Sequence, residues 1–302
     1  MPTLELGPLA LASLLAGHGL RKKSLSPSGA GAAFVVGYIM LGGGAWIFGV
    51  SLISFYLLGS RATKFGKARK AQLEDEYHVG GYGYRSGWQV LSNSFAALVA
   101  ALIWNAAFAP ASLPAWIAGD SAPDAPVYDG QWCPIDSSIA EGWSRRLLFV
   151  VLGHFACCLG DTLASELGIL SQGRPILITT LQPVPPGTNG GVSRGGTLAS
   201  IAGGATMGLV MAACLVAESP ACRATALPLF AQLTAVGALC GGGGSLLDSL
   251  LGATIQETRY SEERKLVSDR GAHLVGLNLL SNNQVNVVSS IVTAVVAGWL
   301  AV

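Results

Sequence analysis

Long apolar blocks alternate with short polar segments along the whole chain. Six blocks approach the length of a membrane-spanning helix, which is roughly 20 residues. Because lipid offers no partner to backbone N–H and C=O groups, such blocks predict transmembrane helices. The six blocks are residues 3–19, 89–110, 146–170, 197–217, 226–252 and 283–302.

A further apolar stretch, residues 31–59, carries Gly42, Gly43 and Gly44 at its centre. Three consecutive glycines weaken a helix, so we predict two short helices that form a hairpin and return to the same side. The expected fold class is therefore all-α. We predict a polytopic integral membrane protein with about six full spans plus a short helical hairpin, or about seven to eight membrane helices. All of them belong to a single transmembrane domain, residues 1–302.

The basic residues support the hairpin and orient the chain. With one long helix over 31–59, the basic segments 21–23 and 61–70 would lie on opposite sides of the membrane. With a hairpin, 15 of the 18 lysines and arginines share one side, which the positive-inside rule assigns to the cytosol. This topology gives a cytosolic basic loop at 60–87, an outer loop at 111–144 and a cytosolic glycine-rich loop at 171–196.

The amino-acid composition agrees with an integral membrane protein. Of the 302 residues, 51% are hydrophobic and only 12% are charged, and the mean hydropathy is +0.51. A soluble domain carries about 25% charged residues, so this chain could not cover a globular surface of its size. The net charge of +1 gives no sign of nucleic-acid binding.

Two of the six cysteines, Cys133 and Cys222, fall in outer loops. They could pair if the outer side faces an oxidising compartment. They could equally remain free thiols, because the sequence gives no distance between them. The other four lie within predicted spans, where a small apolar thiol is common.

Three acidic residues inside apolar spans are the first candidates for chemistry: Asp161, Glu166 and Asp248. Each costs about 2.5–3.5 kcal/mol on insertion scales, so each needs a partner, a cation, a proton or water. Pairing among themselves as packing contacts is the simpler alternative. The predicted topology brings all three toward the cytosolic face. The same depth is predicted for Asn282, Asn283 and Asn286, at the start of the last span.

Two cytosolic segments suggest anion binding. The glycine-rich loop 185–196 leaves backbone N–H groups free to approach an anion, and a helix N-terminus follows it; a flexible turn is the alternative. The basic segment 61–70 could clamp phosphate. It could also only set topology or contact lipid headgroups.

Together these segments resemble the transmembrane protein 19 family, also called the domain-of-unknown-function 92 family. The most specific motifs are DTLASELG at 161–168, GTNGGVS at 187–193 and GSLLDSLLGATIQ at 244–256, whereas loop 111–144 matches nothing known. The first motif also looks like one in the CTP-dependent dolichol and phytol kinases. The Lys-Thr-x-Glu-Gly-Ser element of those kinases is replaced here by GTNGGVS, so the nucleotide is left open.

The resemblance implies a function, because plant and cyanobacterial members are phytyl-phosphate kinases. The expected activity is that of an isoprenyl-phosphate kinase at the cytosolic face, which converts phytyl or geranylgeranyl monophosphate to the diphosphate with Mg²⁺ and a nucleoside triphosphate, CTP or ATP. Asp161, Glu166 and Asp248 are expected to hold the metal, and Lys64 and Lys67 to clamp phosphates. The residues expected to complete the nucleotide and polar site are Gly187, Thr188, Asn189, Gly190, Gly191, Ser193, Asn282, Asn283 and Asn286.

Two other function classes stay open: a membrane transporter or lipid scramblase, and a non-catalytic membrane protein. A transporter should carry polar groups into the outer half of the membrane, where only His154 and Asn105 are predicted. The expected partners are the lipid bilayer and a prenyl-phosphate lipid, without nucleic acid. The endoplasmic reticulum or another endomembrane is the expected location, with the plastid envelope as the alternative.

Overall fold

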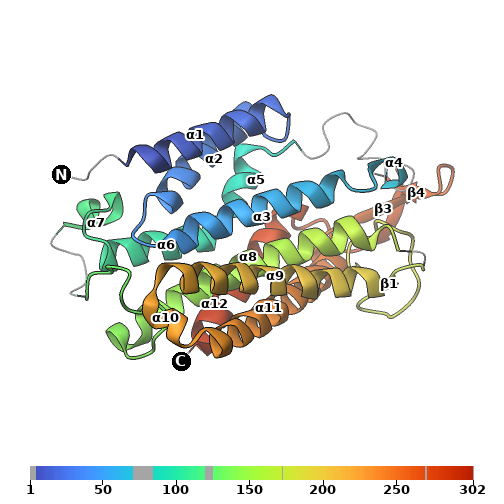
Figure 1. Cartoon of the computed structure of the whole chain (residues 1–302). Helices are drawn as coiled ribbons and strands as arrows, with labels where there is room; N and C mark the ends of the chain where they lie inside the picture. Colours follow the sequence, from blue (N-terminus) through green and yellow to red (C-terminus); the bar gives the residue numbers. More distant parts are fainter. Residues whose placement is uncertain (1–4, 71–83, 120–124, 172, 269–270, 302) are drawn as a thin grey trace.

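A computed structural model describes residues 5–70, 84–119, 125–171, 173–268 and 271–301. The chain is predominantly helical (Figure 1). The longer helices are α1 (Leu6–Arg21), α2 (Pro27–Leu41), α3 (Trp46–Lys64), α6 (Phe95–Phe108), α8 (Trp143–Gly168), α9 (Arg194–Glu218), α11 (Ala226–Ile255) and α12 (Asn282–Leu300). The short ones are α4 (Lys67–Lys70), α5 (Gly87–Ser92), α7 (Leu113–Ala118), the 3-10 helix η3 (Ile139–Gly142) and α10 (Pro220–Ala224).

Within the described ranges, four helices are long and apolar enough to cross a membrane: α8 with its 3-10 extension, α9, α11 and α12. Helices α2 and α6 are apolar but shorter. The predicted block 89–110 is divided between α5 and α6, because the chain leaves the helix at Asn93 and Ser94. A multi-pass integral membrane protein is therefore supported, and the count of six to eight membrane helices stays a prediction.

The predicted break in the stretch 31–59 is confirmed. Helix α2 ends at Leu41 and α3 begins at Trp46, and the two helices run in opposite directions (Figure 1). The side-chain oxygen of Asn105 accepts the N–H of Gly44 at 3.0 Å. Asn105, one of the two polar residues predicted in the outer half of the membrane, thus fixes the turn of the hairpin.

Helix α8 is the centre of the bundle. It packs against α3, α6, α9, α11 and α12, and most of its side chains between Leu147 and Gly160 are buried. Its neighbours α9 and α11 approach each other at glycines. A Cβ atom added to Gly204 would overlap the carbonyl oxygen of Gly237, and one added to Gly237 would overlap the carbonyl oxygen of Gly204. Small residues at such crossings let membrane helices pack closely.

This contact predicts opposite effects for two glycine-to-alanine changes. In a helix, alanine is favoured over glycine by about 1 kcal/mol. Gly204→Ala should nevertheless lower the thermal unfolding temperature in detergent, because the added methyl group forces α9 and α11 apart. Gly243→Ala is the matched control on α11, since nothing lies within 4 Å of a Cβ atom there; it should leave the unfolding temperature unchanged or raise it. Equal effects of the two changes would contradict the close crossing.

Two small antiparallel sheets, which the sequence did not predict, accompany the predominantly helical fold. Strand β1 (Ile176–Leu177) pairs with β2 (Gly191–Val192), and β3 (Thr258–Ser261) lies between β4 (Leu266–Val267) and β5 (Ala272–Val275). These strands gather with α4 at one end of the bundle (Figure 1). Strands of two to four residues are too short to show a recognisable alternation of polar and apolar positions.

The opposite end is closed by the outer loop. Cys133 and Cys222, 89 residues apart in sequence, form a disulfide, which answers the question that the sequence left open. The hydroxyl of Ser219 donates to the carbonyl of Trp132 at 3.1 Å, and the Glu218 carboxylate accepts the N–H of Trp46 at 3.2 Å. These contacts join the loop, α10 and the start of α3.

Exposed tryptophans mark the boundary of the membrane at this end. Tryptophan is enriched at membrane–water interfaces, where its ring lies at the level of the headgroups. Four exposed tryptophans lie at or near the ends of helices on the disulfide side: Trp46, Trp116, Trp143 and Trp299. Because tryptophan is enriched at both interfaces, this belt does not tell the outer face from the cytosolic one, and the orientation derived from the basic residues stays a prediction.

Candidate functional site

Two intramembrane aspartates meet where α8, α11 and α12 pack together. Asp161 of α8 accepts a hydrogen bond from the hydroxyl of Ser245 on α11 at 3.3 Å. Asp248, one turn further along α11, accepts from the hydroxyl of Ser289 on α12 at 2.8 Å. Because Ser245 and Asp248 are one turn apart on α11, the two carboxylates lie near each other at this three-helix contact. Like charges held together in a low-dielectric region are unfavourable unless a cation or a proton compensates them.

One of the three predicted asparagines joins this pair. With its amide nitrogen turned toward α11, Asn286 donates to the Asp248 carboxylate at 3.2 Å and to the Asn282 carbonyl at 2.9 Å. The Asn282 side chain is exposed and that of Asn283 is half-buried. The polar cluster therefore consists of Asp161, Ser245, Asp248, Asn286 and Ser289, two of which, Ser245 and Ser289, were missed. Serines are common in membrane helices, so nothing in the sequence distinguished these two.

The glycine-rich loop lies against the same turn of α11. Gly190 has a positive φ of 76°, and a Cβ atom there would overlap Ala253 and the carbonyl of Ser249, the residue after Asp248. Asn189 fixes the loop to the start of β3: its N–H donates to the hydroxyl of Thr258 and its side-chain amide to the carbonyl of Glu257, both at 3.1 Å. The loop and the aspartates are thus neighbours, as the predicted topology required.

The hydrogen bonds of this loop argue against the prediction that it is an open phosphate cradle. The N–H groups of Thr188 and Gly191 already donate to the carbonyls of Pro185 and Thr188, and that of Asn189 is used by Thr258. The Ser193 hydroxyl caps α9 by accepting from Gly196 at 3.1 Å. The loop is therefore a fixed turn beside the site, with fewer free N–H groups than an open phosphate cradle would offer.

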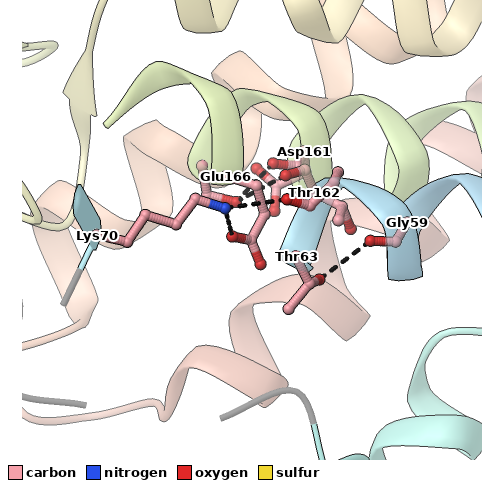
Figure 2. A network of polar contacts seen from close by, with 8 residues as sticks. Gly59, Thr63, Lys70, Asp161, Thr162 and Glu166 are labelled. Atoms are coloured by element: carbon pink, nitrogen blue, oxygen red, sulfur yellow. Dashed lines mark hydrogen bonds and ion pairs between the residues drawn. The ribbon is translucent and has the colours of Figure 1, made fainter. Parts of the chain in front are cut away.

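A buried ion pair holds the basic segment against α8. The ammonium group of Lys70, on α4, lies 2.6 Å from the Glu166 carboxylate and donates to the carbonyl of Ala62 at 3.0 Å (Figure 2). Lys70 is 0% exposed and Glu166 is 6% exposed. Lys64 is exposed at the end of α3, and the side chain of Lys67 lies outside the described residues. Lys70, which was not chosen from the sequence, is the lysine that reaches an intramembrane acid.

The three predicted metal ligands do not form one cluster. In the described part of the chain, no group of three or more histidines, cysteines, aspartates or glutamates is arranged to hold a metal ion. Glu166 is held by Lys70, while Asp161 and Asp248 remain as a pair. A pair still fits Mg²⁺, which proteins often bind through one or two carboxylates with substrate phosphates supplying further oxygen ligands.

Comparisons with known proteins extend over nearly the whole chain. A family model described as "Integral membrane protein DUF92" matches residues 10–294. Protein PGR of Arabidopsis thaliana is 36% identical over 290 residues, which cover 94% of this chain and 91% of that protein. An uncharacterized membrane protein of Synechocystis sp. is 32% identical over 191 residues, 63% of this chain and 60% of that protein. Another from Methanocaldococcus jannaschii is 26% identical over 281 residues, 91% and 85% of the two chains. No solved structure matches significantly.

Proposed function

Because the chain belongs to the integral membrane protein family DUF92, as its motifs indicate, we propose that it is an isoprenyl-phosphate kinase. The acceptor would be phytyl or geranylgeranyl monophosphate, and the donor CTP or ATP. An oxygen of the lipid phosphate attacks the terminal phosphorus of the nucleotide. The bond from that phosphorus to the bridging oxygen breaks, which yields the lipid diphosphate and a nucleoside diphosphate.

The aspartate pair carries this proposal. The acceptor is already an oxyanion, so the reaction needs no strong general base; it needs two anions held in line and their charge neutralised. Asp161 and Asp248 are the residues that would hold Mg²⁺, and the ion would supply that neutralisation. Ser245 holds the carboxylate of Asp161, and Ser289 and Asn286 hold that of Asp248. Two neighbouring carboxylates in apolar helices are better explained by a cation site than by packing, because intramembrane acids are costly unless they serve a function.

The remaining predicted residues receive different roles. Glu166 binds Lys70, so we assign it to the support of the basic segment and no longer to the metal. Exposed Lys64 stays a candidate for contact with the nucleotide phosphates, and so does Lys67. The loop 187–193 would form one wall of the nucleotide site, beside the turn of α11 that carries Asp248.

The disulfide supports a location in which the outer face is oxidising. Disulfides persist in the lumen of the endoplasmic reticulum and outside the cell, and Cys222 lies in α10, at the end of the bundle opposite the small strands (Figure 1). An endomembrane with the active site toward the cytosol is the proposed location, and the plastid envelope is the alternative.

Transport of a lipid or an ion is the second candidate. The observation that favours it is His154, fully buried in the middle of α8, where an ionisable group is unusual. Its Nε2 lies 3.8 Å from the sulfur of Cys158. A transport path would have to continue from this histidine to the outer face, where Asn105 is already committed to the turn at Gly44.

A phosphoryl-transfer assay separates the candidates. Purified protein in detergent would be given phytyl or geranylgeranyl monophosphate with Mg²⁺ and radiolabelled CTP or ATP. We expect labelled lipid diphosphate from at least one combination and none without Mg²⁺. The absence of product in every combination, from protein with an intact thermal unfolding transition, would overturn the kinase proposal for these substrates and favour transport.

A further inference from the structure

An apolar groove opens between α3, α8 and α9, next to the Lys70–Glu166 pair. Its volume is about 370 Å³, within the range of roughly 300–1,000 Å³ that is typical of ligand sites. The groove borders the ion pair directly, because Ala62 lines it and the carbonyl of Ala62 accepts the Lys70 ammonium. The apolar walls are formed mainly by Leu58, Phe65, Leu159, Leu163 and Leu167.

The groove runs along the helices from the cytosolic end toward the middle of the membrane. Leu167 lies next to the end of α8, and Leu159 lies about 12 Å deeper at roughly 1.5 Å per residue. This depth is nearly half of a hydrocarbon core of about 30 Å. The hydroxyl of Thr206, in the α9 wall, donates to the carbonyl of Ala202 at 2.7 Å, so it does not make the groove polar.

Among the described residues that line the groove, Arg61 is the one cation. Arg61 is exposed near the cytosolic end of α3, and its side chain has no hydrogen bond or ion pair to any residue that the structure describes. A guanidinium at headgroup depth suits the oxygens of a phosphate. The groove therefore combines a hydrocarbon surface with one positive charge at its polar end.

We propose that this groove binds the hydrocarbon chain of a single-chain lipid monophosphate, with Arg61 against its phosphate. The proposal rests on the proposed function, for which this lipid is the acceptor. Asp161 contacts α11 whereas Leu163 lines the groove beside α3, so the hydrocarbon chain of the lipid and the aspartates would lie on two sides of α8, with the phosphate near the cytosolic end of that helix. The groove is long enough only for the part of the chain nearest the phosphate, and the rest would extend into lipid.

Photo-crosslinking tests the groove without relying on catalysis. The full-length protein in detergent would be irradiated with geranylgeranyl monophosphate carrying a diazirine close to the phosphate, and labelled peptides would be mapped by mass spectrometry. We expect labels on α3 and α8. Leu163→Trp, which fills the groove, should reduce them roughly tenfold. The matched control is Leu209→Trp, because Leu209 is on α9 but exposed outside the groove. This variant should be labelled to the same extent as the wild type.

Competition distinguishes a substrate groove from contact with bulk lipid. Unlabelled phytyl monophosphate should displace the probe, whereas phosphatidylglycerol at the same concentration should not. Equal displacement by both, or labelling unaffected by Leu163→Trp, would overturn the proposal. If Leu163→Trp fails to fold, Thr206→Trp fills the groove from α9 and gives the same test. Arg61→Gln should weaken labelling by the monophosphate and leave labelling by the free alcohol unchanged.

The outcomes also separate the groove from the kinase. Labelling of α3 and α8 that Leu163→Trp removes, from a protein that transfers no phosphate, would support the groove and overturn the kinase proposal. Phosphoryl transfer by Leu163→Trp with an unchanged KM for the lipid would overturn the groove and leave the kinase proposal standing.

Discussion

Asp248→Asn is expected to lower phosphoryl transfer by about 100-fold or more while leaving the protein as stable as the wild type, or more stable. Removing one well-placed electrostatic group from an active site typically costs about 10²–10³ in rate. Stability should not fall, because the change removes one of two acidic groups that lie near each other in an apolar region, where an uncompensated charge is unfavourable. The asparagine oxygen can still accept the hydrogen bond that Ser289 donates. Initial rates at several Mg²⁺ concentrations and the thermal unfolding temperature in detergent would be measured together.

The combination of lost activity and kept stability distinguishes a metal site from packing. If Asp248 served only to join α11 to α12, Asp248→Asn would lower the unfolding temperature. Activity would then fall only as far as the amount of folded protein falls. Asp161→Asn should behave like Asp248→Asn, and the double variant should be little worse than either, because residues that act as a unit are not additive. Glu141→Gln, which changes an exposed acid in η3, at the opposite end of α8 from Asp161, is the control and should keep full activity. Near-normal rates in Asp248→Asn at low Mg²⁺ would contradict the assigned role.

Much of the arrangement around these aspartates followed from sequence, because it depends on hydrophobicity and charge. The long apolar blocks became α8, α9, α11 and α12, and the three consecutive glycines became the break between α2 and α3. The alternation of the spans was enough to bring Asp161 and Asp248 to one depth, because α8 and α11 are separated by α9 and so run in the same direction. The orientation derived from the lysines and arginines stays a prediction. The structure adds the partners Ser245 and Ser289, which depend on the rotation of each helix about its axis.

The sequence could not predict which lysine of the segment 61–70 pairs with Glu166, because the pairing depends on one turn of the backbone. Gly66, with a positive φ of 65°, turns the chain after α3 so that α4 returns toward α8. This turn brings Lys70 to Glu166 and leaves Lys64 exposed. In the sequence, five basic residues lie between 61 and 70 without a signal that separates them. For a similar reason, the sequence could not decide whether Cys133 and Cys222 pair, because the distance between them is a property of the folded chain.

Lys70→Ala is expected to cause a large loss of stability. The change leaves the carboxylate of Glu166 buried without its lysine partner, and breaking a buried pair from one side typically costs about 3–5 kcal/mol. The unfolding temperature in detergent should fall by many degrees. Lys64→Ala, exposed at the end of α3, is the matched control and should change stability by no more than about 0.5 kcal/mol.

The double variant Lys70→Met with Glu166→Leu shows what the pair is for. Replacing a buried ion pair by apolar residues of similar volume is often neutral or stabilising, so the unfolding temperature should return to that of the wild type. If the pair serves to position α4 and the basic segment beside the site, the KM for the nucleotide should stay raised although stability has recovered. If both the unfolding temperature and the KM for the nucleotide returned to the wild-type values, the charges of the pair would not be needed for the reaction. The pair would then serve only as a packing contact. A normal unfolding temperature in Lys70→Ala would instead contradict the buried pair itself.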